Sequence, residues 1–149
     1  QTAVLCDNDA PDQLSTGDIK GLRTTGAYIC QWEDGNSTER QLFADLPWEN
    51  ISALLAAISG NHDTLELATI IGSIRSDSRV AGQNLATDPA GWPESQTLRQ
   101  VMGDLAHSGS WIKRMDYAEK AFQFALPFLP NTSPLKSRLE ALWNWIQNE

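Results

Sequence analysis

The sequence predicts a mainly α protein: a five- to six-helix antiparallel bundle or irregular helical array with a small N-terminal β-ribbon. Over residues 46–149, apolar residues recur at helical spacing, and serine, proline and glycine stand where helices begin and end. Residues 1–45 are irregular and acidic, with one β-favourable stretch. The 149 residues are expected to form a single domain, which buries enough apolar surface to fold without metals or disulfides.

The ribbon is expected in the N-terminal third. Residues 7–18 are polar, contain Pro11 and Gly17, and are predicted to form a loop. Residues 27–32 favour a β-strand, and residues 4–6 are their expected partner in a small hairpin or ribbon. Because two strands alone are unstable, the ribbon is expected to lie on the helices.

Two helices are predicted in the first half of the helical region. The first runs from about Pro47 to Gly60, with its apolar residues on one face. The second covers residues 65–74, and either Asp63 or Thr64 is expected to cap it. Its apolar residues occupy much of the circumference, which predicts a central helix buried on more than one side.

Further helices are predicted on both sides of a proline-rich turn at residues 88–93. Their expected spans are 80–85, 98–105, 111–125 and 134–146. Ser110 and Ser133 are predicted to cap the last two. Helical spacing places Met115 and Trp143 on the buried faces of these two helices.

Charge points to the kind of partner. The formal net charge is −8, and residues 1–49 hold nine acidic residues against three basic ones. This charge disfavours nucleic acid or an anionic membrane as partner, and no apolar run is long enough for membrane insertion. We expect a non-enzymatic protein-binding domain, an acidic inhibitor or immunity-type protein for a basic partner. The expected contact residues are Asp7, Asp9, Asp12, Asp18, Trp32, Glu33, Asp34 and Trp145.

Trp32 and Trp145 have two interpretations. Trp145 falls off the apolar face of its predicted helix, and Trp32 stands beside Glu33 and Asp34, so one or both are expected to be exposed. Exposed tryptophans near charge are typical anchors of protein interfaces. In the alternative, the N-terminal ribbon covers Trp145 and the aromatic side chain packs internally.

Two other classes of function remain open: a small hydrolase acting on a glycan or peptidoglycan, and a structural or adaptor module of a larger assembly. A glycosidase needs two carboxylates facing a cleft. Asp116 and Glu119 lie one turn apart, but Lys113, Arg114 and Lys120 surround them, which is typical of an exposed salt-bridged face. The sequence therefore predicts no catalytic residue and no cofactor, and it leaves the oligomeric state open.

Cys6 and Cys30 are the two cysteines of the chain. Either they form a disulfide, which would close a long loop and stabilise the N-terminal third, or they are free thiols. A disulfide needs an oxidising compartment. The pair therefore favours an extracellular or periplasmic location, with the cytoplasm as the alternative.

Two short motifs carry ligand-type residues without the context of a metal site. Residues 7–12 place oxygen atoms at alternate positions, as calcium loops do, but lack the glycine and the bidentate glutamate of such loops. Residues 60–63 (GNHD) are similar to a short string of calcineurin-like metallophosphoesterases, but the companion motifs of that family are absent from the sequence. The sequence predicts a polar loop and a helix boundary here, and no metal site.

Overall fold

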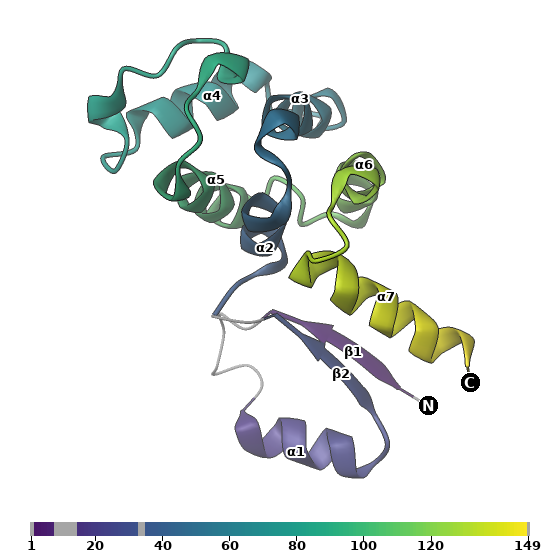
Figure 1. Cartoon of the computed structure of the whole chain (residues 1–149). Helices are drawn as coiled ribbons and strands as arrows, with labels where there is room; N and C mark the ends of the chain where they lie inside the picture. The colour runs from purple at the N-terminus through teal and green to yellow at the C-terminus, as the bar shows by residue number, and fades with distance from the viewer. Residues whose placement is uncertain (1, 8–14, 33–34, 149) are drawn as a thin grey trace.

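Seven α-helices and a two-stranded sheet make up the described part of the chain in a computed structural model (Figure 1). The structure describes residues 2–7, 15–32 and 35–148. The strands are β1 (Ala3–Cys6) and β2 (Tyr28–Gln31). The helices are α1 (Thr16–Thr24), α2 (Thr38–Asp45), α3 (Ile51–Gly60), α4 (Leu67–Ser76), α5 (Gln96–Ser108), α6 (Met115–Ala125) and α7 (Pro134–Gln147). The mainly α fold with a small N-terminal β element is confirmed.

The ribbon is parallel, so the predicted hairpin is wrong. β1 and β2 pair in the same direction, with Leu5 opposite Cys30. Parallel strands need a crossover connection, and α1 provides it. The predicted loop over residues 7–18 is wrong in its last part, because α1 begins at Thr16. Its first turn is closed by a capping box, in which Ser15 and Asp18 accept each other's backbone N–H groups.

The ribbon lies between α1 and α7, and it leads into α2 at the middle of the molecule (Figure 1). The Tyr28 ring stacks on Trp145 of α7 at 5.6 Å between centroids. The Cys30 thiol donates to the carbonyl oxygen of Arg138, also in α7, at 3.8 Å. The expectation that the ribbon lies on the helices is therefore correct, and Tyr28 covers Trp145.

Helix α2 was not predicted from the sequence. Residues 1–45 were predicted to be irregular, yet Thr38–Asp45 is helical and Ser37 caps it by accepting the N–H of Arg40. Leu42 and Phe43 are fully buried. With only three apolar residues in eight positions, α2 is stabilised mainly by its packing against other helices, which local propensity does not report.

Helix α2 packs mainly against α5 and, less extensively, against α7. At α5 the backbones approach closely, because a Cβ on Gly103 would lie 2.9 Å from the Cα of Arg40. Arg99 of α5 donates to the carbonyl oxygens of Phe43 and Leu46 at 2.8 and 2.7 Å, which satisfies the C-terminal end of α2. At α7, the Asp45 carboxylate accepts the N–H of Leu135 at 2.7 Å.

Several predicted helix boundaries and faces are wrong. Only Ile70 and Ile74 of α4 are buried, so α4 is not a central helix. Glu66 is its N-cap residue and makes no side-chain capping bond, so neither Asp63 nor Thr64 caps α4. The short helix expected over 80–85 is a single 3-10 turn. The remaining 3-10 turns are Trp48–Asn50, Pro89–Gly91 and Leu126–Phe128.

Helix α6 begins later than predicted, which changes the face that it buries. The chain turns at Ser110, whose φ is +56°, so Ser110 is not the helix cap. Trp111 and Ile112 enter the core from this turn, and Met115 at the start of the helix is 88% exposed. Trp143 of α7 is 60% exposed, so its predicted core position is also wrong. Ser133, by contrast, caps α7 as predicted, and Ser95, for which no prediction was made, caps α5.

No helix in the described part of the chain is both long enough and apolar enough to cross a membrane.

The close packing of α2 on α5 predicts a cost for a side chain at residue 103. Gly103→Ala places a methyl group against the backbone of Arg40, and we expect it to lower the free energy of unfolding by about 1–3 kcal/mol. The control is Gly72→Ala in α4, whose Cβ would meet nothing within 4 Å. In that variant the better helix propensity of alanine should stabilise the protein by up to about 1 kcal/mol. Urea denaturation measures both, and equal effects would contradict the packing account.

Candidate metal centre

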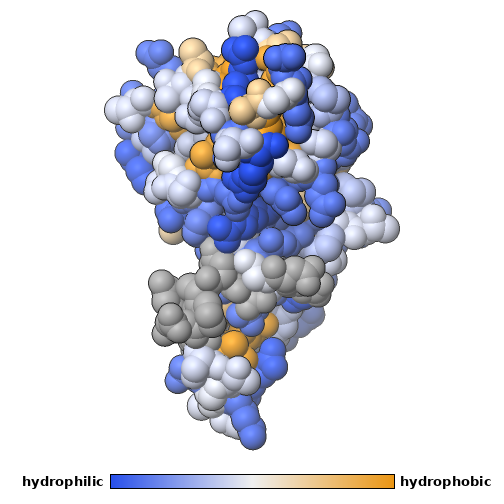
Figure 2. All heavy atoms as spheres, turned by 90° about the vertical axis from the view of Figure 1, so that its left-hand side faces the viewer, coloured by the Kyte–Doolittle hydropathy of each residue, from blue (hydrophilic) through white to orange (hydrophobic). Residues whose placement is uncertain are grey.

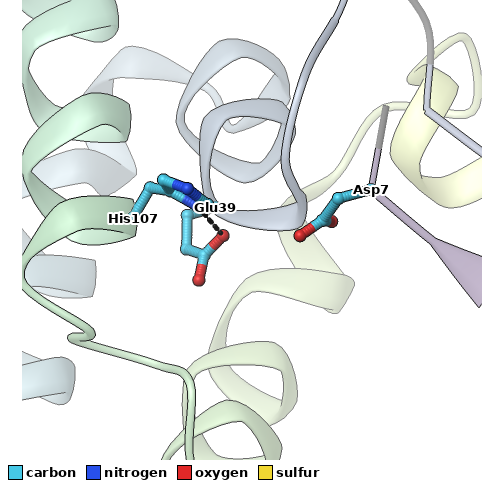
Figure 3. A group of neighbouring side chains, drawn as sticks. All are labelled: Asp7, Glu39 and His107. Carbon is cyan, nitrogen blue, oxygen red and sulfur yellow. Dashed lines mark hydrogen bonds and ion pairs between the residues drawn. The ribbon is translucent and has the colours of Figure 1, made fainter. Parts of the chain in front are cut away.

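Asp7, Glu39 and His107 bring ligand atoms together where the ribbon meets the helices (Figure 3). One atom from each, two carboxylate oxygens and an imidazole nitrogen, lie within 4.8 Å of one another. Asp7 follows β1 directly, Glu39 is in the first turn of α2, and His107 is in the last turn of α5. Three segments far apart in the sequence therefore supply the cluster.

The Asp7 carboxylate is oriented by the N-terminus of α2. Its Oδ1 accepts the backbone N–H and the hydroxyl of Thr38, each at 2.8 Å. The buried Trp32 ring donates its Nε1–H to the same hydroxyl oxygen, also at 2.8 Å. Both of these bonds are made to Oδ1, so Oδ2 accepts no hydrogen bond from Thr38. Such outer hydrogen bonds are what hold ligating carboxylates in place in metal sites.

Glu39 is a buried carboxylate with a histidine as its neighbour. Its side chain is 5% exposed, and Oε2 lies 3.3 Å from Nδ1 of His107. A carboxylate taken out of water needs a compensating positive charge or several hydrogen bonds. A bound cation would supply that charge to Glu39 and, across the cluster, to Asp7.

The donor set fits a divalent metal ion. Carboxylate oxygens suit Mg²⁺ and Mn²⁺, and the addition of one imidazole extends the choice to Zn²⁺ and Fe²⁺. Three protein ligands leave positions for water or substrate, which is the arrangement of catalytic rather than structural zinc sites.

The position of the cluster in the fold also favours ligand binding. β1 and β2 are parallel, so their carboxyl ends lie at the same edge of the ribbon. Asp7 stands directly after β1, and α2 follows β2 after a short connection. In sheets of parallel strands, ligands bind beyond the carboxyl ends. This ribbon has only two strands, but its carboxyl edge is the one that meets α2.

Next to the cluster, two arginine side chains, one from α2 and one from the segment after α4, converge on Asp104 of α5. Nε of Arg40 is 2.7 Å from Oδ1 of Asp104, and Nη1 of Arg79 is 2.6 Å from Oδ2 of the same carboxylate. Burial raises the pKa of Asp104, but the hydrogen bonds from the two arginines outweigh it and lower the pKa below its usual range. Hydrogen bonds from Arg79 lower the pKa of Asp77 to about 2. Both carboxylates are therefore charged at neutral pH.

The residues predicted to contact a protein partner have different environments in the structure. Asp18 is occupied in the capping box of α1, where the hydrogen bonds from Ser15 lower its pKa. Trp32 is 2% exposed, so it is not an exposed anchor. Trp145 is half-buried against Tyr28. Asp9, Asp12, Glu33 and Asp34 lie outside the described residues.

The predicted disulfide between Cys6 and Cys30 is not formed. Cys6 pairs with Gln31 and Cys30 with Leu5, so the two cysteines are one register position apart. Neighbouring positions along a strand point to opposite faces, which turns the two side chains away from the geometry of a bridge. The thiols instead donate to the carbonyl oxygens of Cys30 and Arg138. Burial raises the pKa of both thiols, which keeps them protonated at neutral pH.

The GNHD string forms the end of α3 and the turn after it, as a helix boundary should. Nδ1 of His62 accepts the backbone N–H groups of Thr64 and Leu65. Tyr117 donates its hydroxyl to Asp63 at 2.9 Å. His62 thus contacts the turn that follows it and Asp63 contacts Tyr117 of α6, and neither belongs to the cluster of Asp7, Glu39 and His107.

Sequence reasoning missed Glu39 and His107 and assigned Asp7 to a different role. The alternating oxygen ligands from Asp7 onwards were the one available signal, since they follow a β-favourable segment. Nothing in the sequence linked that signal to α2 or to the end of α5, because both contacts are tertiary.

Comparison with protein-family models, with curated proteins and with solved structures finds no significant match to this chain. No residue therefore takes a role from a relative. The proposals below rest on the contacts, burial and charges of this chain.

Thr38→Val tests the hydrogen bonds that orient Asp7. The variant removes the hydroxyl, so the buried Trp32 Nε1–H loses its acceptor and Asp7 loses one of its two donors. We expect the free energy of unfolding to fall by about 1–3 kcal/mol in urea denaturation. Thr38→Ser keeps the hydroxyl and should lose clearly less. An equal loss of stability in the two variants would show that the hydroxyl does not contribute to the free energy of unfolding.

Asp77→Asn tests the ion pair with Arg79 through its pH dependence. The folded pKa of about 2 lies below the value of about 3.9 expected in the unfolded chain. The pair therefore stabilises the fold above about pH 4, and this stabilisation is lost as the pH falls towards 2. We expect the variant to be less stable at pH 7 by about 0.2–1 kcal/mol, as for exposed pairs. Denaturation at several pH values should show the difference vanishing near pH 2, and a constant difference would refute it.

Proposed function

We propose that this chain binds a divalent metal ion through Asp7, Glu39 and His107, and that the metal centre is its functional site. The reaction class that it supports best is metal-assisted hydrolysis. The observation that carries the proposal is the convergence of two carboxylates and an imidazole, one of them a buried carboxylate, within 4.8 Å. A bound ion would supply Lewis acidity and lower the pKa of a coordinated water.

The surroundings of the three residues support a site built for an ion. Thr38 donates two hydrogen bonds to Asp7, and Trp32 donates to the Thr38 hydroxyl. Helix α5 places His107 opposite Glu39. Both α2 and α5 are rigid elements joined by the packing at Gly103. Functional sites need such supporting contacts, because small displacements of a ligand weaken binding and catalysis.

The earlier hypothesis, an acidic protein that binds a basic partner, stays a prediction. Its support is the overall charge of −8. Of its contact residues within the described ranges, Asp7 and Asp18 accept internal hydrogen bonds and Trp32 is buried. The geometry therefore favours the metal centre over a partner-binding surface, with Asp7 as a metal ligand.

Titration with Mn²⁺ tests the proposal. After treatment with EDTA and its removal, the parent protein should bind one Mn²⁺ in isothermal titration calorimetry, and the fraction of free Mn²⁺ seen by electron paramagnetic resonance should fall accordingly. Glu39→Gln should weaken binding by more than about tenfold, since even outer-sphere changes cost about 10–100-fold. The parent protein should also hydrolyse bis(p-nitrophenyl) phosphate in the presence of Mn²⁺, and Glu39→Gln should hydrolyse it more slowly.

The matched control is Glu140→Gln, which removes the same charge from an exposed position of α7. It should leave Mn²⁺ affinity unchanged, and circular dichroism should confirm that both variants are folded. Equal affinity of the parent and Glu39→Gln would mean that Glu39 and His107 form a structural pair only. Binding without hydrolysis would leave the ion site standing and refute the reaction class.

A further inference from the structure

Exposed apolar side chains gather at α7 and at the 3-10 turn that precedes it. Six large apolar side chains are exposed among the described residues, and four of them belong to these two elements. The four are Leu126, Phe128, Trp143 and Ile146, with exposed fractions between 38% and 60%. Figure 2 shows the side of the molecule on which α4 lies, where apolar side chains appear in separate areas among hydrophilic ones. Apolar side chains that gather in one place mark interaction surfaces.

Helix α7 has one side that packs on the fold and one apolar stripe that stays open to solvent. On the packed side, Leu135 is fully buried and Trp145 stacks on Tyr28. Leu139, Trp143 and Ile146 follow at intervals of four and three residues, which places them on one stripe of the helix. Leu139 is half-buried, whereas Trp143 and Ile146 are exposed.

A groove of about 550 Å³ lies between this stripe and the turn Leu126–Phe128. Leu126 lines it from the turn, and Leu139 and Trp143 line it from α7. Lys136 and Glu140, also of α7, complete the charged part of the lining. An apolar groove beside an exposed tryptophan has the chemistry of a protein interface, in which such side chains act as anchors.

The charges of the groove select the partner. Lys136 and Glu140 give it one charge of each sign, although the chain as a whole carries −8. A two-fold interface brings the same surface of two copies together, so that surface has to be complementary to itself. When two α7 helices lie antiparallel about an axis near Leu139, Lys136 of each copy approaches Glu140 of the other. The groove therefore attracts its own copy, where a strongly charged partner would gain nothing.

We propose that two copies of this chain associate through α7, with the two helices antiparallel across a two-fold axis. Trp143 of each copy then lies beside Lys136 and Leu139 of the other, at the groove, and the apolar side chains leave water together. The inference does not rest on the proposed metal centre, because none of Asp7, Glu39 and His107 lines this groove.

Sedimentation equilibrium tests the association, with EDTA and a reductant present so that neither metal ions nor disulfides can link the copies. We expect the mean mass to rise with concentration from one chain to two and then to stay constant. The mass of a single chain up to millimolar concentration would overturn the proposal and leave the groove to a different protein. A mass that keeps rising beyond two chains would overturn the two-fold arrangement.

Trp143→Ser should weaken the association by roughly tenfold or more, as the loss of an interface anchor does. Met115→Ser is the matched control, because it removes an apolar side chain that is 88% exposed at the far end of α6 from the groove. It should leave the association unchanged. Equal weakening in the two variants would show only unspecific apolar attraction and would overturn the proposal.

An exchange of charges tests the antiparallel pairing itself. Lys136→Glu and Glu140→Lys each give the groove two like charges, so each variant alone should associate severalfold more weakly than the parent. An equimolar mixture should regain the association, since the two altered grooves then carry opposite charges. A mixture that associates no better than its components would refute the pairing.

Circular dichroism verifies the fold of each variant. Lys136 donates to Asn131 at 2.7 Å, so Lys136→Glu removes an internal contact, whereas Glu140 is exposed. If Lys136→Glu does not fold, Glu140→Lys alone decides: unchanged association of this variant would overturn the proposal.

Discussion

The close packing of α2 against α5 is the constraint on which the rest of the structure depends. It exists because residue 103 is glycine, so the α5 backbone approaches the Cα of Arg40 to a distance that a side chain would block. Arg99 completes the contact by binding the carbonyl groups at the end of α2. This contact sets Glu39 opposite His107 and Arg40 opposite Asp104. The proposed metal centre is therefore a consequence of this helix pair.

Helix α2 also connects the N-terminal ribbon and the C-terminal helix to the rest of the molecule (Figure 1). At its N-terminus, Thr38 binds Asp7 from the end of β1. At its other end, Asp45 accepts the hydroxyl of Ser133 and the N–H of Leu135 at the start of α7. Carboxylates are stabilised at helix N-termini by the exposed N–H groups and the helix dipole. Asp7 and Asp45 thus connect elements by accepting hydrogen bonds from the N-terminus of a neighbouring helix.

This use of acidic residues changes the meaning of the net charge. The surplus of carboxylates suggests a negative surface, but Asp7, Asp18 and Asp45 each accept hydrogen bonds at a helix N-terminus. Arg40, Arg79 and Arg99 pair with Asp104, Asp77 and Glu94, so these six groups add no net charge to the surface around them. The charge that a ligand meets therefore depends on where the fold places each group, and a total over the chain does not report it.

The sequence by itself determined the fold class and the helices whose signals are local. α5 and α7 begin at serine caps and keep an apolar face over three or more turns, so both were predictable. The short α1 and α2 were not, because few of their residues are apolar and α2 buries polar Glu39 and Gln41. The tertiary structure alone decided that β1 and β2 pair in parallel, that Cys6 and Cys30 are free thiols, and that Asp7 lies near Glu39 and His107. These features join segments distant in sequence, and no local pattern of residues encodes which distant segments will pack together.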